Sequence, residues 1–370
     1  MSIDISKLPQ EVQIVLSKFP EFQLNDYNDS GANGYVLIGW HQVLKKRVAI
    51  KIYFHEENGV EQEPSIIQKI RHPNVLEVYD ARIIEKNCSY FLMPAANYGD
   101  LATFLNRYNI LTRLALNFLC QLLSGIAALH ASPNNLVHRD LKPENLLIND
   151  DDLLIADFGS VRKIPVTTGK APASKHSILY RPPEAFGTNA FFDYSSDIYQ
   201  AGLIGFLLFG GKLSNDLLHH LTPKENTKLK TIYSSSDAYQ ISIYIDSCIE
   251  NKIKKNNLID LNSLPFYIPK SIKSVLRKAV SEYSKRYSKT SEFLADLSKI
   301  QLNFPDWLET GDGFQLYNWK GNDYLLMENN GKYVLKKKRH TAPTYRIDSS
   351  ISGNSFEEIF TALKEKIALP

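Results

Sequence analysis

The spacing of apolar and polar residues divides the chain into a strand-rich first part and a helical second part. Between about 25 and 93, short strand-like segments alternate with one helical stretch at 61–71, and residues 89–93 end a strand. From residue 99 onward the pattern is helical, and the apolar positions of 111–130 predict a long helix. An amphipathic segment at 9–18 predicts a short helix with proline in its first turn, which packs on the strand-rich part or docks a partner.

The end of the chain, 301–370, has a pattern of its own. Asn330 and Gly331 lie between alternating apolar residues, which is a strong hairpin signal. Ser355 and Glu358 have the spacing of a helix capping box. The segment therefore predicts a small α+β unit, made of strands at 313–319, 323–328, 332–338 and near 344–348 and a helix over 356–367.

The composition is that of an ordinary soluble protein. The 370 residues, 44% hydrophobic and 22% charged, suffice for a two-lobed catalytic domain and something smaller. The net charge of +3 creates no overall field toward nucleic acid or an acidic membrane. Cys88, Cys120 and Cys248 lack metal-ligand spacing, so we expect reduced thiols.

We expect no membrane span and a cytoplasmic location. The longest apolar run, near 201–209, is too short to cross a bilayer. The first residues lack the basic and apolar regions of a signal peptide. Export as an effector stays open, because no residue decides it.

Two motifs carry candidate chemistry. Residues 137–148 read Val-His-Arg-Asp-Leu-Lys-Pro-Glu-Asn-Leu-Leu-Ile, and Asp-Phe-Gly follows at 157–159. They supply two acids, Asp140 and Asp157, together with Lys142 and Asn145. Phosphoryl transfer from Mg-ATP to a hydroxyl needs such a set: a group that orients the hydroxyl, a cation near the γ-phosphate, and oxygen ligands for magnesium.

Through these motifs the chain resembles the eukaryotic-like (Hanks-type) serine/threonine protein kinases over about 25–300. The resemblance implies a bilobal protein kinase fold of the α+β class, with a β-rich N-lobe at 25–94 and a helical C-lobe at 95–300. Residues 1–24 would be a helical extension, and 301–370 a C-terminal α+β appendage. The implied activity is transfer of the γ-phosphoryl group of ATP to serine or threonine hydroxyls of proteins.

The resemblance also implies roles for single residues. Asp140 would orient the substrate hydroxyl, and Lys142 would neutralise the transferring phosphoryl group. Asn145 and Asp157 would hold Mg²⁺, or Mn²⁺ in its place. Lys51, at the end of Val-Ala-Ile-Lys, would bridge the α- and β-phosphates of ATP.

In the family a helix glutamate holds this lysine. Glu63 is expected to do so here, because it lies ten residues before Pro73, and Glu61 is the alternative. Pro64 departs from the family pattern, since proline disfavours helical geometry in the residue before it.

The glycine-rich loop at 29–36 is incomplete. Gly31, Gly34 and Val36 stand where the family has its second and third glycines and its valine, but Asp29 replaces the first glycine. Glycine serves there because backbone amides approach phosphates closely. The other residues implied around ATP are Ala49 and Leu147 beside the adenine, Met93 as gatekeeper, and Ala95 with Ala96 as the hinge.

Arg139 suggests how the activity is regulated. In kinases with this arginine, a phosphate on the activation segment often pairs with it. We expect autophosphorylation at Ser174 or at the Thr167 and Thr168 pair, and the alternative is an ordinary loop whose hydroxyls are incidental. Ser177 is expected to bridge Asp140 and Lys142.

The resemblance also implies structural roles for further residues. Glu184 closes an Arg-Pro-Pro-Glu segment at 181–184 and would form a buried ion pair with Arg286. Asp197 would cap the backbone of the catalytic loop. The packing residues expected around the site are His138, Phe158, Ile67 and Val78.

Two other functions compete with an active protein kinase. The first is an ATP-binding pseudokinase or scaffold that acts through the appendage, motivated by Asp29 and Pro64. The second is a kinase with a small-molecule acceptor, against which the Pro-Pro-Glu segment argues. The basic run 336–340 either binds nucleic acid or an acidic partner, or is a solvated face. The residues expected to dock the appendage are Trp307, Tyr317 and Trp319.

Overall fold

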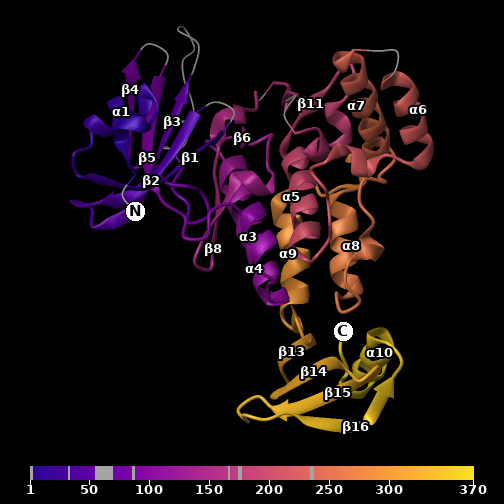
Figure 1. The fold of residues 1–370 in the computed structure, drawn as a ribbon. Helices are drawn as coiled ribbons and strands as arrows, with labels where there is room; N and C mark the ends of the chain where they lie inside the picture. Colours follow the sequence, from indigo (N-terminus) through magenta and orange to yellow (C-terminus); the bar gives the residue numbers. More distant parts are fainter. Residues whose placement is uncertain are drawn as a thin grey trace.

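A computed structural model describes residues 3–31, 34–54, 70–85, 88–165, 167–173, 177–233 and 237–370. Figure 1 shows an N-lobe sheet at the upper left, a helical lobe in the centre and right, and a second sheet with one helix at the bottom. The α+β fold expected from the resemblance is therefore confirmed, including the C-terminal appendage.

The N-lobe is a five-stranded antiparallel sheet in the order β1-β2-β3-β5-β4. Its strands are β1 (Phe22–Gly31), β2 (Gly34–His41), β3 (Lys46–Phe54), β4 (Asp80–Glu85) and β5 (Cys88–Pro94). Val48, Ile50 and Ile52 of β3 pack against helix α1 (Gln10–Ser17), which begins directly after Pro9. The helix expected at 9–18 thus packs on the small lobe. Ala49 of β3 belongs instead to the core that continues into the helical lobe.

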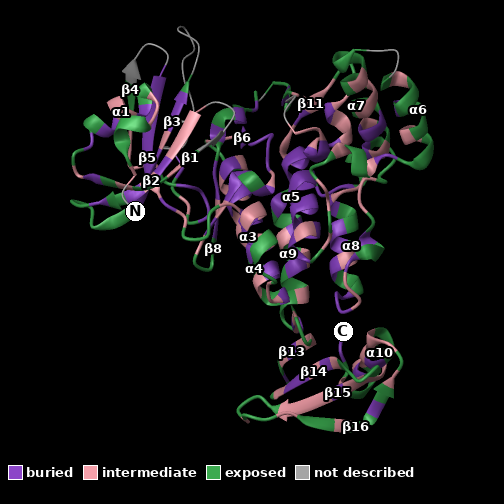
Figure 2. Cartoon of the chain, viewed as in Figure 1, coloured by how far each residue is buried: buried purple, intermediate pink, exposed green. Residues whose placement is uncertain are grey.

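The helical lobe is built around α4 and α5. Figure 2 shows α5 buried along most of its length, with α4, α8 and α9 around it. Gly202 lets α5 approach α8, because a Cβ atom on this glycine would lie 2.8 Å from the Cβ of Ala279. The helices are α3 (Leu101–Arg107), α4 (Thr112–His130), α5 (Tyr194–Leu208), α6 (Pro223–Tyr233), α7 (Ala238–Lys254), α8 (Lys270–Ala279) and α9 (Thr290–Gln301).

Short elements hold the loops of this lobe. Three two-stranded sheets pair β6 (Leu136–Val137) with β9 (Arg162–Lys163), β7 (Leu146–Asn149) with β8 (Asp152–Ile155), and β10 (Ala171–Pro172) with β11 (Phe191–Phe192). The 3₁₀ helices of this lobe are η2 (Pro143–Asn145), η3 (Phe158–Ser160), η4 (Ile178–Tyr180), η5 (Pro183–Ala185), η6 (Leu217–His220), η7 (Leu261–Ser263) and η8 (Tyr283–Lys285), while η1 (Ile5–Lys7) precedes α1 near the N-terminus.

One helix in the described part of the chain is long and apolar enough to cross a membrane. It is α4, with 19 residues, and 56% of its most apolar window is buried inside the structure. Leu119, Leu122 and Leu123 of α4 are fully buried among the other helices. Such burial is typical of the core helix of a folded lobe.

The appendage is a five-stranded antiparallel meander with α10 packed on one face. Its elements are β12 (Asp306–Thr310), β13 (Gly313–Trp319), β14 (Asn322–Asn329), β15 (Lys332–Arg339), β16 (Arg346–Gly353) and α10 (Phe356–Ile367). The strand expected at 313–319 and the helix at 356–367 are confirmed, whereas β12 was not foreseen. Only half of the capping box forms: Ser355 Oγ accepts from Glu358 N at 3.2 Å, but the Glu358 carboxylate accepts from Asn354 N.

The appendage and the helical lobe share one hydrophobic core. Trp307 of β12 is 1% exposed and stacks on Tyr267 of the lobe, with ring centroids 5.6 Å apart. Thr112 Oγ1 donates to Pro305 O at 2.7 Å and accepts from Trp307 N at 2.9 Å. Trp307 therefore docks the appendage as expected. The other two expected docking residues lie in β13, where Trp319 donates to Ile367 O within the appendage and Tyr317 pairs with Asp306.

Candidate active site

The catalytic loop is held by the first turn of α5. Asp193 caps this helix in a capping box with Ser196, which fixes the turn that carries Asp197. The fully buried Asp197 carboxylate accepts from His138 N at 2.9 Å and from Arg139 N at 3.0 Å. The expected cap of the loop backbone is thus present. Asp197 also lies 2.8 Å from His130 Nε2, so both of its oxygens are occupied.

Gln200, one turn further along α5, ties the loop to the end of the activation segment. It accepts from Leu141 N at 3.0 Å and donates to Arg139 O and Tyr180 O at 3.2 and 3.1 Å. The sequence interpretation assigned Gln200 no role. The available signal was a single amide among the apolar residues of a buried helix, because such a group needs partners.

Asp140, Lys142 and Asn145 meet in this loop. Asp140 Oδ2 accepts from Asn145 Nδ2 at 3.1 Å and lies 3.5 Å from Lys142 Nζ. Asp140 Oδ1 is buried and has no hydrogen-bond partner among the described residues. Lys142 Nζ also donates to Ser177 Oγ at 3.1 Å, so Ser177 contacts Lys142 as expected. Lys142 lies between Ser177 and Asp140, and it is the lysine that links the two.

Asp157 and Lys51 join the two lobes. Asp157 has a left-handed backbone (φ 58°, ψ 76°), and its carboxylate lies 3.2 Å from Lys51 Nζ in the centre of β3. Burial raises the pKa of Asp157, but the charge and hydrogen bond of Lys51 outweigh it, and the pKa is lowered overall. The Asp157 side chain is still 49% exposed, so it can take further partners.

The expected packing residues lie behind this pair. The rings of His138 and Phe158 are 5.5 Å apart, and both are buried. His138 Nε2 lies 3.1 Å from Ala156 O, which makes a structural histidine. Val78 packs against the same core, whereas Ile67 lies outside the described residues.

The residues that are expected to surround the adenine lie at the junction of the two lobes. Ala49, Met93 and Ala95 are buried, while Val36 and Leu147 are half-buried and pack against the same core. Gly34 faces Gly31 across β1 and β2, and a Cβ atom on Gly34 would meet Ile52 O at 1.9 Å. A close strand approach therefore demands glycine here, and phosphate contact by Gly31 and Gly34 stays a prediction.

Several expected residues lie outside the described part. They are Glu63 and its alternative Glu61, Pro64, and Ser174 of the activation segment. The Lys51–Glu63 pair and a phosphate on Ser174 therefore stay predictions.

Arg139 is bound to the main chain of the activation segment. It is 8% exposed, its Nε donates to Ser160 O at 2.6 Å, and its Nη1 donates to Pro172 O at 2.6 Å. Burial, with the nearby charge of Arg162, lowers the pKa of Arg139 to about 10. Thr167 and Thr168 are exposed on the same segment. The sequence pattern did not foresee that carbonyl oxygens take the place expected for a phosphate.

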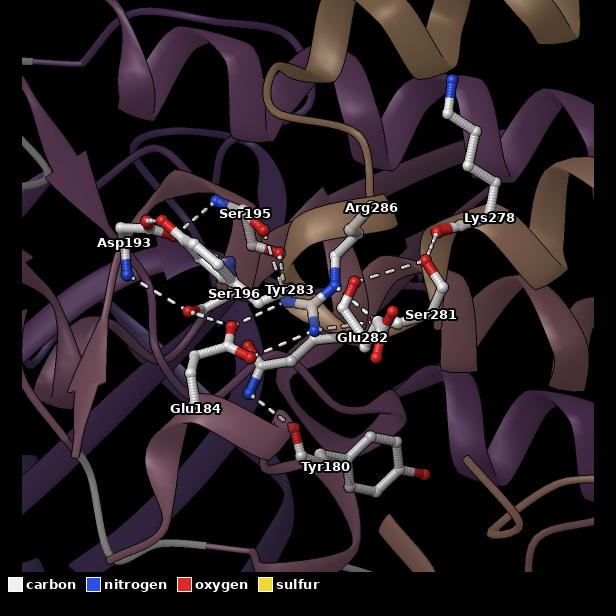
Figure 3. Close-up of polar contacts among 11 residues, drawn as sticks. Tyr180, Glu184, Asp193, Ser195, Ser196, Lys278, Ser281, Glu282, Tyr283 and Arg286 are labelled. Carbon is white, nitrogen blue, oxygen red and sulfur yellow. Dashed lines mark hydrogen bonds and ion pairs between the residues drawn. The ribbon is translucent and has the colours of Figure 1, made fainter. Parts of the chain in front are cut away.

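The Glu184–Arg286 ion pair is confirmed, and Figure 3 shows the contacts around it. Arg286 Nη1 and Nη2 donate to Glu184 Oε1 and Oε2 at 2.6 and 3.1 Å, which is a bidentate pair. Ser196 Oγ donates to Glu184 Oε1 at 2.9 Å, and Arg286 Nε donates to Ser281 O at 3.1 Å. The ring of Tyr199 lies under this guanidinium, with its centroid 4.9 Å from Arg286 Cζ.

Comparison with known proteins agrees with this geometry. A family model described as "Protein kinase domain" matches residues 29–293. Serine/threonine-protein kinase ATG1c of Arabidopsis thaliana is 32% identical over 194 residues, 50% of this chain and 26% of that protein. Probable serine/threonine-protein kinase KCC4 of Saccharomyces cerevisiae is 32% identical over 203 residues, 50% of this chain and 19% of that protein.

Calcium-dependent protein kinase 6 of Plasmodium berghei is 33% identical over 173 residues, 45% of this chain and 11% of that protein. The matches thus span between 11% and 26% of the length of these relatives. The family model, in contrast, covers most of this chain, including the catalytic loop and the activation segment. The chain belongs to the protein kinase family, whose members are ATP-dependent phosphotransferases, and the enzyme class expected from the sequence is thereby confirmed.

Proposed function

We propose that the chain is an active serine/threonine protein kinase, which transfers the γ-phosphoryl group of Mg-ATP to serine or threonine hydroxyls of proteins. The observation that carries this proposal is Asp140 Oδ1, a buried acceptor without a partner among the described residues. A buried carboxylate oxygen without a hydrogen bond is costly, and its retention suggests that a substrate group completes it.

Each group near Asp140 then has a chemical task. Asp140 accepts the hydrogen bond of the substrate hydroxyl and takes its proton as the oxygen attacks the γ-phosphorus. The bond from the γ-phosphorus to the bridging oxygen breaks, and ADP leaves. Lys142, 3.5 Å from Asp140, offsets the charge on the transferring group, and Ser177 positions Lys142.

The oxygen donors of the site suit a hard cation. Among the described residues no three His, Cys, Asp or Glu side chains form a metal-binding group by themselves. Asn145 donates to Asp140 O and to Asp140 Oδ2 through Nδ2, so its Oδ1 is oriented as an acceptor, and Asp157 is half exposed. Magnesium, or manganese, is commonly held by one or two such groups together with phosphate oxygens, and it would neutralise charge between the phosphates.

Autophosphorylation of the activation segment is part of this proposal. Thr167 and Thr168 are exposed hydroxyls, and the exposed Lys163 and Lys170 lie on the same segment. Ser174 is the third candidate. We further propose a reducing compartment such as the cytoplasm, since the cysteines are free thiols.

The test is a labelling assay on the purified chain. Radiolabelled ATP and Mg²⁺ are added to the wild type and to an Asp140→Ala variant, and the labelled positions are mapped. Label on the wild type alone supports the proposal, and its loss in a T167A/T168A/S174A variant locates it in the activation segment. ATP binding without label on chain or added protein would instead indicate a scaffold.

A further inference from the structure

The turn between β2 and β3 exposes large apolar side chains at its tip. It consists of residues 42–45, and within it Val43 is 75% exposed and Leu44 is 42% exposed. Trp40, two residues before the turn, is 44% exposed. Single exposed apolar side chains are common on protein surfaces, but three of them within five positions form a patch, and such a patch indicates an interaction site.

Hydrogen bonds fix the conformation of this turn. Leu44 N donates to Nδ1 of the buried His41 at 3.3 Å, and Gln42 N donates to Glu21 O at 2.9 Å. Lys45 ends the turn with a left-handed backbone (φ 52°). Every residue of the turn is exposed, so the turn projects from the N-lobe as a convex tip and does not line a groove.

Cations adjoin the apolar tip. Lys45, Lys46 and Arg47 follow it directly along the chain, and all three are exposed. Lys46 Nζ lies 3.9 Å from the ring centroid of Tyr79, while neither Lys45 nor Arg47 forms an ion pair with the described residues. Arg47 is the cross-strand neighbour of Trp40, so the guanidinium and the indole share one face of the hairpin.

The charge and shape of this tip suit a lipid surface. Residues 40–47 contain no carboxylate, and the carboxylate of the adjoining Glu21 faces His41 Nε2 at 3.6 Å. Apolar side chains enter the boundary between headgroups and acyl chains, tryptophan favours that boundary, and anionic headgroups attract lysine and arginine. A protein partner fits less well, because lysine is depleted in protein interfaces.

We propose that residues 40–47 dock the chain on a bilayer surface that carries anionic phospholipids. Val43 and Leu44 enter the headgroup region, Trp40 lies at the boundary with the acyl chains, and the cations at 45–47 pair with phosphate and carboxylate groups of the lipids. The binding is peripheral and reversible, because a short tip buries far less apolar area than a spanning helix. This inference goes beyond the proposed kinase function and does not depend on phosphoryl transfer.

Sedimentation of the full chain with vesicles, without ATP, tests the apolar contact. The chain should bind vesicles of phosphatidylcholine with about 30% phosphatidylserine, and not vesicles of phosphatidylcholine alone. Val43→Ser should raise the lipid concentration at half-binding about tenfold. Leu302→Ser, which removes an 85% exposed leucine at the end of α9, should leave that concentration unchanged. No binding to the anionic vesicles, or equal effects of the two variants, would overturn the inference.

A pair of double variants tests the charges. K45Q/R47Q should raise the lipid concentration at half-binding about tenfold to thirtyfold, the effect of two cations close to an anionic surface. K332Q/R346Q removes the same charge from exposed positions of the appendage and should change that concentration by less than about threefold. Equal losses in the two would mean that binding follows the overall charge of the chain, which contradicts docking through the tip.

Tryptophan emission locates the contact. Two of the three tryptophans, Trp307 and Trp319, are buried, so Trp40 is the exposed one. Anionic vesicles should shift the emission to shorter wavelength, and Trp40→Phe should lose the shift but still sediment. A shift that persists in Trp40→Phe would place the contact elsewhere and refute the proposal. Self-association without lipid, or oligonucleotide binding in preference to vesicles, would also refute it if Val43→Ser abolished that interaction, because the tip would then serve another partner.

Discussion

Two polar clusters lie close to the same helix, α5, and differ in how completely their groups are bonded. Around Glu184 and Arg286, both carboxylate oxygens and all guanidinium nitrogens have partners, and the side chains are 4% and 0% exposed. Around Asp140 and Lys142, one carboxylate oxygen has no partner among the described residues. Here the side chains are 10% and 26% exposed.

This difference in bonding distinguishes a cluster that stabilises the fold from a cluster that serves catalysis. In a closed cluster, whose charges are all paired, the ion pairs and hydrogen bonds of the folded state offset the cost of desolvation. In an open cluster, such as that around Asp140 and Lys142, the desolvation of the unpaired oxygen is offset only when a ligand binds. Interactions that form only with the reacting group are the ones that can favour its transition state. We therefore expect substitutions in the first cluster to change stability and substitutions in the second to change turnover.

The largest effect is expected from Asp140→Ala. Removal of the group that orients and deprotonates the hydroxyl should lower kcat by a factor of about 10²–10⁴. The free energy of unfolding should stay within about 1 kcal/mol of the wild type, because one of the removed oxygens was unsatisfied. Steady-state kinetics and urea denaturation of the same preparation measure both. A loss of stability as large as that of an Arg286 variant would remove the distinction between the clusters.

The next effect is expected from breaking the closed cluster. Arg286→Met leaves Glu184 buried and unpaired, which should cost about 3–5 kcal/mol of unfolding free energy. A double variant, Glu184→Leu with Arg286→Met, should be more stable than either single variant, since no charge is then left alone. Denaturation curves of the four proteins form a double-mutant cycle. Additive single effects would contradict a coupled pair.

The sequence predicted these two clusters for a common reason. Asp140, Lys142 and Glu184 stand in local motifs, the catalytic loop and the Pro-Pro-Glu segment, and the resemblance to the kinase family implied Arg286 as the partner of Glu184. In the appendage, α10 was predicted to the residue because its apolar period and Ser355 are local signals.

Long-range contacts were beyond that kind of signal. Nothing in the local pattern of 306–310 shows that Trp307 stacks on Tyr267 or that Thr112 bonds to Pro305. The same holds for Arg139, whose partners are carbonyl oxygens that every residue possesses.

A smaller effect should distinguish the exposed ion pair from the buried one. Lys51 lowers the pKa of Asp157 below its usual 3.8, so the ionised carboxylate stabilises the fold. This contribution is complete above the unfolded pKa of about 3.9 and is lost as the pH falls through the lower folded value. Because Asp157 is 49% exposed, Asp157→Asn should cost less than about 1 kcal/mol at pH 7.

The difference between wild type and Asp157→Asn should therefore shrink below about pH 4. Chemical denaturation between pH 3 and pH 7 measures it, with Asp140→Asn as a second carboxylate control. A difference that grows on acidification would mean that the pKa of Asp157 is raised, and would refute the pairing with Lys51.

The smallest effect is expected from the exposed hydroxyls of the activation segment. Arg139 already donates to Ser160 O and Pro172 O, so a phosphate is not needed to hold its charge in place. A T167A/T168A variant should therefore keep kcat within about a factor of two of the wild type, although it removes candidate sites of label. The measurement is kcat of this variant beside wild type before and after phosphatase treatment. A larger loss of kcat, in the variant or in the wild type after phosphatase treatment, would contradict this expectation. Arg139 would then need a phosphate partner and would belong with Asp140 in the open cluster.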